Sequence, residues 1–100
     1  MNTLLHKATS PATGATTPLL PETGKATFQA VLKGTGAITA TILLEVSNDG
    51  ENWLNLVTFT MTGTTVVTDG AVSDAPWAYV RARLTAITGT SANASVLMGV

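Results

Sequence analysis

The stretch Ala37–Val46 reads AITATILLEV and alternates apolar residues with mostly polar ones. Successive side chains of a β-strand point to opposite faces of the sheet, so a period of two predicts a strand with one buried face. The β-branched residues in this stretch also favour a strand. Its predicted core face consists of Ile38, Ala40, Ile42, Leu44 and Val46. We therefore expect an all-β fold around this segment.

The same period recurs on both sides. The segment Lys25–Lys33 precedes Gly34–Gly36, and further strands are expected over 53–62, 64–70, 77–88 and 94–100. The inward residues predicted in these strands are Ala26, Phe28, Ala30, Leu32, Trp53, Val57, Phe59, Met61, Ala78, Val80, Ala82, Leu84, Ala86, Ala94, Val96 and Met98, with Asn55 as a polar exception. Short strands at this spacing predict two facing sheets, a small β-sandwich of about six to eight antiparallel strands.

The stretch VSNDGENW, Val46–Trp53, contains the turn residues Asn48, Asp49 and Gly50. Such residues tolerate left-handed backbone and bond their own main chain. They favour a hinge between two strands over a binding site. Val46 is then the last inward residue of one strand and Trp53 the first large inward residue of the next.

The segment Met1–Gly24 holds three of the four prolines and shows no strand or helix period. Proline removes donors that a β-ladder needs, so we expect an extended arm at 1–24 and the sandwich domain at 25–100. Two interpretations stay open. The arm is either a loose terminus, or it becomes ordered on a neighbouring subunit through the leucine pairs Leu4, Leu5, Leu19 and Leu20.

The composition excludes several classes of function. Charged residues make up 11% of the chain and the net charge is −1, so there is no basic field for nucleic acid. The chain has no cysteine for disulfides or thiolate metal sites. We find no apolar run long enough for a signal peptide or a membrane span, and expect synthesis in the cytoplasm. A surface poor in charge suits a protein packed against neighbours.

Catalysis and metal binding are not expected. The single histidine, His6, lies in the predicted arm, so no nucleophile and base pair can be assembled on rigid strands. Asp49 and Glu51 share one turn, and Asp69 and Asp74 another loop, without the spacing of a calcium loop. We predict no enzyme activity, no cofactor and no metal.

One predicted outward face stands out in the segment WAYVRARLT. It presents Trp77, Tyr79, Arg81 and Arg83 at every second residue. Aromatic residues and arginine are enriched in protein interfaces, so this face is a candidate partner contact. The same residues could stack on sugars or bases. Alternatively, the arginines pair with Glu45 across strands.

Four segments together resemble a group of small virion proteins of tailed bacteriophages. They are SNDG followed by tryptophan at Ser47–Trp53, TDG at Thr68–Gly70, DAPWAYVRARLTAITGT at Asp74–Thr90 and ASVLMGV at Ala94–Val100. The resemblance covers Ile42–Val100 and implies an immunoglobulin-like or jelly-roll-like β-sandwich without enzymatic activity. The residues that match the pattern of this group are turn and core residues: Asn48, Asp49, Gly50, Trp53, Pro76, Trp77, Tyr79 and Arg81.

These observations lead to one expected function and two alternatives. The expected function is a capsid decoration or cement protein of the virion, which binds the major capsid protein and neighbouring copies in a homo-oligomeric or multicopy assembly. The N-terminal arm would make inter-subunit contacts. The alternatives are a tail, neck or fibre component, and a carbohydrate-binding module in host recognition.

Overall fold

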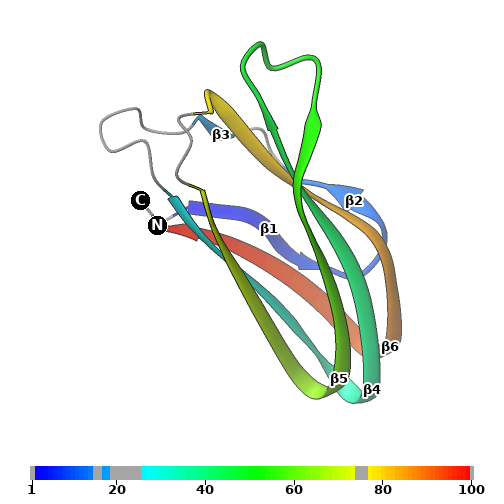
Figure 1. Ribbon diagram of the computed structural model, residues 1–100. Helices are drawn as coiled ribbons and strands as arrows, with labels where there is room; N and C mark the ends of the chain where they lie inside the picture. The colour runs from blue at the N-terminus through cyan, green and yellow to red at the C-terminus, as the bar shows by residue number, and fades with distance from the viewer. Residues whose placement is uncertain (1, 15–16, 19–25, 74–76, 100) are drawn as a thin grey trace.

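The computed structural model describes residues 2–14, 17–18, 26–73 and 77–99 (Figure 1). Several residues named above lie outside these ranges: Leu19, Leu20, Pro21, Asp74 and Pro76. The described chain is all-β and antiparallel, as expected. Its strands are β1 (Asn2–Ala8), β2 (Ala12–Thr13), β3 (Thr17–Pro18), β4 (Ala26–Ser47), β5 (Leu54–Ser73) and β6 (Tyr79–Gly99).

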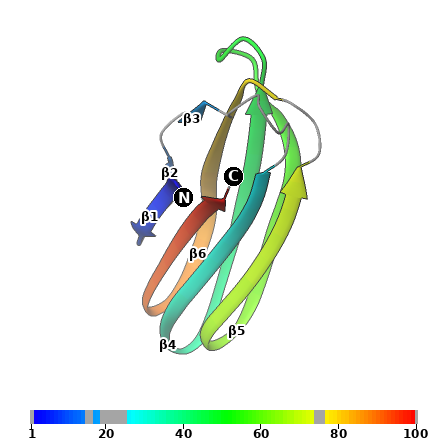
Figure 2. The ribbon, with the colours of Figure 1, turned by 90° about the vertical axis from the view of Figure 1, so that its left-hand side faces the viewer.

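All these strands belong to one sheet with the order β1-β6-β4-β5, and β2 and β3 also pair with β6. The strands β4, β5 and β6 are 22, 20 and 21 residues long. Each of them bends back near its middle, at the lower end of Figure 1, so that the two halves of the sheet face each other (Figures 1 and 2). The expected count of six to eight separate strands is therefore not confirmed. Six of the expected strands are halves of three continuous ones.

Glycines explain why three long strands replace six expected short ones. The sequence around Gly34–Gly36, Gly63 and Gly89 predicts breaks, but the hydrogen-bonded ladders continue past all three positions. The ladders shift register there, between Lys33 and Ala37 on the β5 side and between Lys33 and Thr39 on the β6 side. Glycine permits the positive φ of a sharp bend, which Gly36 adopts at 71°. The bends therefore fold the sheet without ending the strands.

The hydrophobic core lies on the inner faces of the two halves. All five predicted core residues of Ala37–Val46 are buried, as are the four from Lys25–Lys33 and the three from the last strand. The prediction of burial is also confirmed for five further residues: Phe59, Met61, Val80, Ala82 and Leu84. The period of two therefore predicted correctly, over most of the chain, which residues face the core.

Two β-bulges change the expected faces. One extra residue, Leu56, lies between Asn55 and Val57 where Leu44 and Glu45 of β4 are consecutive. A bulge reverses the alternation beyond it, so Asn55 is exposed and does not face the core. A second bulge at Thr85 exposes Ala86, which was predicted to be buried, and packs Ile87 against the core.

The N-terminal segment differs from the predicted extended arm in the part that the structure describes. β1 pairs with β6 from Asn2 opposite Met98 to Ala8 opposite Ala94, and β2 and β3 continue along β6. Leu4 and Leu5 are 1% and 6% exposed and belong to the core. Backbone N–H and C=O groups of β6 that β4 does not use pair with these short N-terminal strands. These two leucines are therefore not exposed anchors for a neighbouring subunit.

Candidate functional site

A charged and aromatic cluster lies on the outer face of the sheet, beside the turn that joins β4 to β5. We name it the arginine face and define it by Glu45, Trp53, Tyr79, Arg81 and Arg83. Strand register brings these side chains together, because β4 pairs with β6 through Glu45 opposite Arg81, Leu43 opposite Arg83 and Ser47 opposite Tyr79. Side chains two residues apart on a strand share one face.

One carboxylate serves two guanidinium groups in this cluster. The Nε of Arg81 donates a hydrogen bond to Oε1 of Glu45 at 2.8 Å, and Nη2 of Arg83 lies 4.0 Å from Oε2. Glu45 is 8% exposed, whereas the side chain of Arg83 is 43% exposed. This arrangement confirms the cross-strand pairing with Glu45 that the sequence offered as one interpretation. It also leaves one positive charge in excess.

Arg83 is the less satisfied of the two arginines. Its Nε is buried and has no hydrogen-bond partner within the described residues. Arginine presents its donors as a planar fork that matches a carboxylate with two parallel bonds. The buried Nε is out of reach of a partner, but 43% of the Arg83 side chain is exposed, so an external acidic group could bind its outer part without competing with the bond between Arg81 and Glu45.

Trp53 covers Arg81 from the turn side. The guanidinium carbon of Arg81 lies 4.3 Å from the centre of the Trp53 ring, within the range of a cation–π contact. The sequence period places Trp53 inside, but the bulge at Leu56 turns it to the outer face. The contribution of Trp53 to this site was therefore missed, and only the bulge explains its position.

The turn itself uses its polar groups internally. The Asp49 carboxylate accepts hydrogen bonds from the Ser47 hydroxyl, the backbone N–H groups of Glu51 and Asn52, and the Asn52 side-chain amide, at 2.8–2.9 Å. Gly50 has a φ of 76°, and a Cβ added to it would lie 3.5 Å from the Tyr79 ring. Asn48 Oδ1 accepts from the N–H of Ala78. The predicted hinge role agrees with these bonds, because Asp49 already has four donors.

These hydrogen bonds hold the pKa of Asp49 well below its ordinary value of 3.8. The largest cause is the Asn52 side-chain amide, followed by the backbone N–H groups of Asn52 and Glu51 and the Ser47 hydroxyl. A lowered folded-state pKa means that the ionised carboxylate stabilises the fold above about pH 4. That contribution is lost as the pH falls further towards the folded-state pKa.

We expect Asp49→Asn to reduce stability at pH 7, with a difference from wild type that shrinks below pH 4. The amide keeps the shape but replaces one of the two acceptor oxygens with a donor. Urea unfolding midpoints at pH 7, 4 and 3 measure the difference. Glu51→Gln is the matched control, since it removes the same charge from the same turn. A difference for Asp49→Asn that does not change with pH would contradict the stabilising role of the carboxylate.

The other predicted contact residues divide into two groups. Tyr79 is half-buried on the outer face beside Arg81, as predicted. Trp77 is half-buried and packs against the hydrophobic core. Its position before the first residue of β6 removes it from the strand alternation on which the prediction relied.

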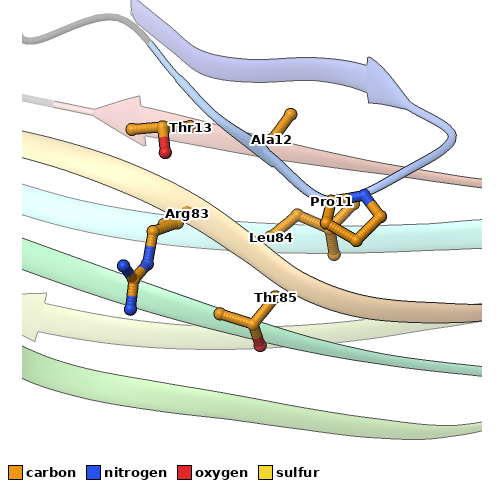
Figure 3. Close-up of a pocket in the computed structure, with 6 residues that line it drawn as sticks. All are labelled: Pro11, Ala12, Thr13, Arg83, Leu84 and Thr85. Atoms are coloured by element: carbon orange, nitrogen blue, oxygen red, sulfur yellow. The ribbon is translucent and has the colours of Figure 1, made fainter.

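A shallow groove continues from Arg83 along the edge of β6. It is lined by Pro11, Ala12 and Thr13 from the N-terminal segment and by Arg83, Leu84 and Thr85 from β6 (Figure 3). This groove could not be predicted from the sequence, because it depends on the pairing of β2 with β6. The groove extends the surface that a partner of Arg83 would cover.

Side chains that could ligate a metal ion do not cluster in the part of the chain that the structure describes. The described residues contain no group of three or more histidine, cysteine, aspartate or glutamate side chains able to hold a metal ion. His6 is exposed on β1. Within the same ranges no helix is long and apolar enough to cross a membrane.

Comparison with known proteins gives information on the fold. No protein-family model and no curated protein sequence matches the chain. A similar solved structure is the crystal structure of SPBc2 prophage-derived protein YomS, with a TM-score of 0.53 and 13% identity. The match covers 98% of this chain and 90% of that one. At this identity the likeness establishes a shared fold.

Proposed function

We propose that this chain is a non-enzymatic structural protein of a bacteriophage particle, and that it attaches to the particle through the arginine face. The observation that carries the proposal is the pairing of one buried carboxylate with two arginines, which leaves Arg83 exposed and only partly bonded. Arginine and tryptophan are the residues that most often dominate binding energy in interfaces. A rigid sheet fixes them in place.

Three further observations support the assignment to a phage particle. The fold is shared with a prophage-derived protein. The sequence segments from the SNDG turn to the last strand resemble virion proteins of tailed phages. The surface has few charges, as expected of a subunit that is packed among others. Within the particle we propose a decoration role on the capsid, where the partner is the major capsid protein.

The carbohydrate-binding alternative has less support. Sugars stack on exposed flat aromatic rings, but the guanidinium of Arg81 lies over the Trp53 ring. Trp77 packs against the core. Each tryptophan thus already has a packing partner within the chain, which leaves this alternative with less support.

The experiment that tests the location is a copy-number measurement. Quantitative mass spectrometry of purified particles of the phage that encodes the chain is expected to find it in a number comparable to the major capsid protein. Ring-shaped tail or neck components follow closed symmetry and occur in about six or twelve copies. A number of that size would replace the decoration role with a tail or neck role. Absence from the particle would overturn the proposal.

The attachment surface is tested by Arg83→Glu, which reverses the charge that the partner is proposed to bind. We expect the amount of protein bound to particles that lack it to fall at least tenfold, or about 1.4 kcal/mol. Lys33→Glu is the matched control, because Lys33 is an exposed cation on β4 outside the arginine face. Circular dichroism checks that both variants fold. Equal binding by the two variants would remove the arginine face from the proposal.

A further inference from the structure

Among the strands that the structure describes, β5 has a neighbour on one side only. It is the last strand in the order β1-β6-β4-β5 and pairs with β4 along Leu54–Ser73. Figure 2 shows it at the side of the molecule opposite β1. The outer edge of a terminal strand carries backbone N–H and C=O groups that can pair with another strand. At 20 residues, this edge is long.

The side chains of β5 do not protect this edge. There is no charged residue from Leu54 to Thr68, and Asp69 is the single charge in the strand. Natural proteins usually blunt free edges with lysine, proline, bulges or short strands. The bulge at Leu56 and the bend at Gly63–Thr65 interrupt β5, but straight uncharged stretches remain between and after them.

The opposite edge of the sheet is protected. β1 is 7 residues long and shifts register twice within its pairing with β6. It carries the exposed side chains His6 and Lys7, and Lys7 has a φ of 46°. The neighbouring segments β2 and β3 have two residues each. Protection at one edge and its absence at the other indicates that β5 is covered in the working assembly.

Exposed hydrophobic side chains point to the same strand. Among the described residues, the large hydrophobic side chains that are exposed are Leu54, Val66 and Val72, at 48%, 52% and 61%. All of them lie on β5. Val66 and Val72 belong to the same half of the strand and lie on the same face of the sheet. The even-numbered residues between and beside them on this face are also exposed: Thr64, Thr68 and Gly70. The two valines therefore border a single stretch of free backbone.

We propose that the β5 edges of two copies of this chain pair antiparallel and form a symmetric dimer with a continuous sheet across the interface. A second copy offers one unprotected edge, its own β5, since its β1 edge is blocked. The uncharged residues also permit self-pairing, because a strand that meets itself places like charges opposite each other wherever it has them. Only registers that set Asp69 against its own copy are disfavoured. This inference does not rest on the proposed function.

Analytical ultracentrifugation of the full chain tests the dimer. We expect wild type to sediment with twice the monomer mass of 10.2 kDa at micromolar concentration. The double variant Val66→Lys/Val72→Lys places four positive charges along the paired strands of the dimer and removes the exposed valines, so its dimer dissociation constant is expected to rise at least tenfold. The matched control Thr3→Lys/His6→Lys adds the same charges to exposed positions of β1 and is expected to leave the dimer unchanged. A monomeric wild type would overturn the proposal.

A second measurement locates the interface without relying on charge changes. The chain has no cysteine, so Thr68→Cys and Thr3→Cys each provide one site for a nitroxide label. In the proposed dimer the two Thr68 labels lie on the paired strands and are closer together than the two Thr3 labels, which lie at its far sides. Electron spin resonance distances that reverse this order would show a dimer built on another surface and would overturn the pairing of β5.

Discussion

Replacing Phe59 with alanine is expected to lower the free energy of unfolding by about 3–5 kcal/mol. Phe59 is 1% exposed and pairs across the ladder with Ile42, which is fully buried. Its removal leaves a cavity, and the strands on either side cannot collapse into it without disturbing the ladder. A domain of this size has a total stability of roughly 5–15 kcal/mol, so the loss is a large share.

Urea unfolding followed by the fluorescence of Trp53 and Trp77 measures this effect. Thr60→Ala is the matched control, because Thr60 is the next residue on the same strand and is exposed. It is expected to change stability by less than about 1 kcal/mol. If Phe59→Ala cost no more than the control, the inner face of β5 would not be part of the core.

Gly89→Ala is expected to cost about 2–4 kcal/mol. Gly89 has a φ of 129°, a backbone conformation that residues with a Cβ rarely adopt. An added Cβ would also lie 2.6 Å from Cγ2 of Ile38 and 3.0 Å from the carbonyl oxygen of Ala37. Ile38 is fully buried, so it has little room to move away. Both effects act at the bend of β6.

Gly36→Ala separates the two causes. Gly36 has a φ of 71° at the bend of β4, but a Cβ there would meet no atom within 4 Å. Its expected cost is therefore the backbone term alone, about 1–2 kcal/mol. Thermal unfolding of both variants gives the comparison. A Gly89→Ala variant as stable as Gly36→Ala would mean that Ile38 adjusts freely.

Much of the fold follows from the alternation in β4. This strand keeps a strict period of two on each side of its bend because the extra residues of both bulges, Leu56 and Thr85, lie in its neighbours. The central strand could therefore be predicted correctly. The faces of Asn55 and Ala86 could not, since a bulge depends on how two distant strands pair and leaves no mark in either one alone.

The strand count failed for a related reason. A glycine flanked by threonines can either end a strand or bend it. A bend is favoured when it lets the two halves of the sheet pack their apolar faces together, and this depends on distant residues. The position of the N-terminal strands was likewise not readable, because Leu4 and Leu5 bury themselves against β6, more than 80 residues later in the chain. Local patterns carry no information on such a distant partner.

The candidate site was predicted in part. The period of two placed Tyr79, Arg81 and Arg83 on one face, and cross-strand pairing with Glu45 was among the interpretations. Trp53 was missed because a bulge moved it outward. Trp77 precedes the strand and packs against the core, which the period of two did not predict.

The place of β6 in the sheet has a consequence for synthesis on the ribosome. β6 is the strand that contacts β1, β2, β3 and β4, yet it follows all of them in the chain. While the ribosome makes the first 78 residues, the hairpin of β4 and β5 can form, but the N-terminal strands have no partner. Pairing of residue 2 with residue 98 then closes a loop of nearly the whole chain, a slow step for a β protein. Folding is therefore expected to finish only after β6 has left the exit tunnel.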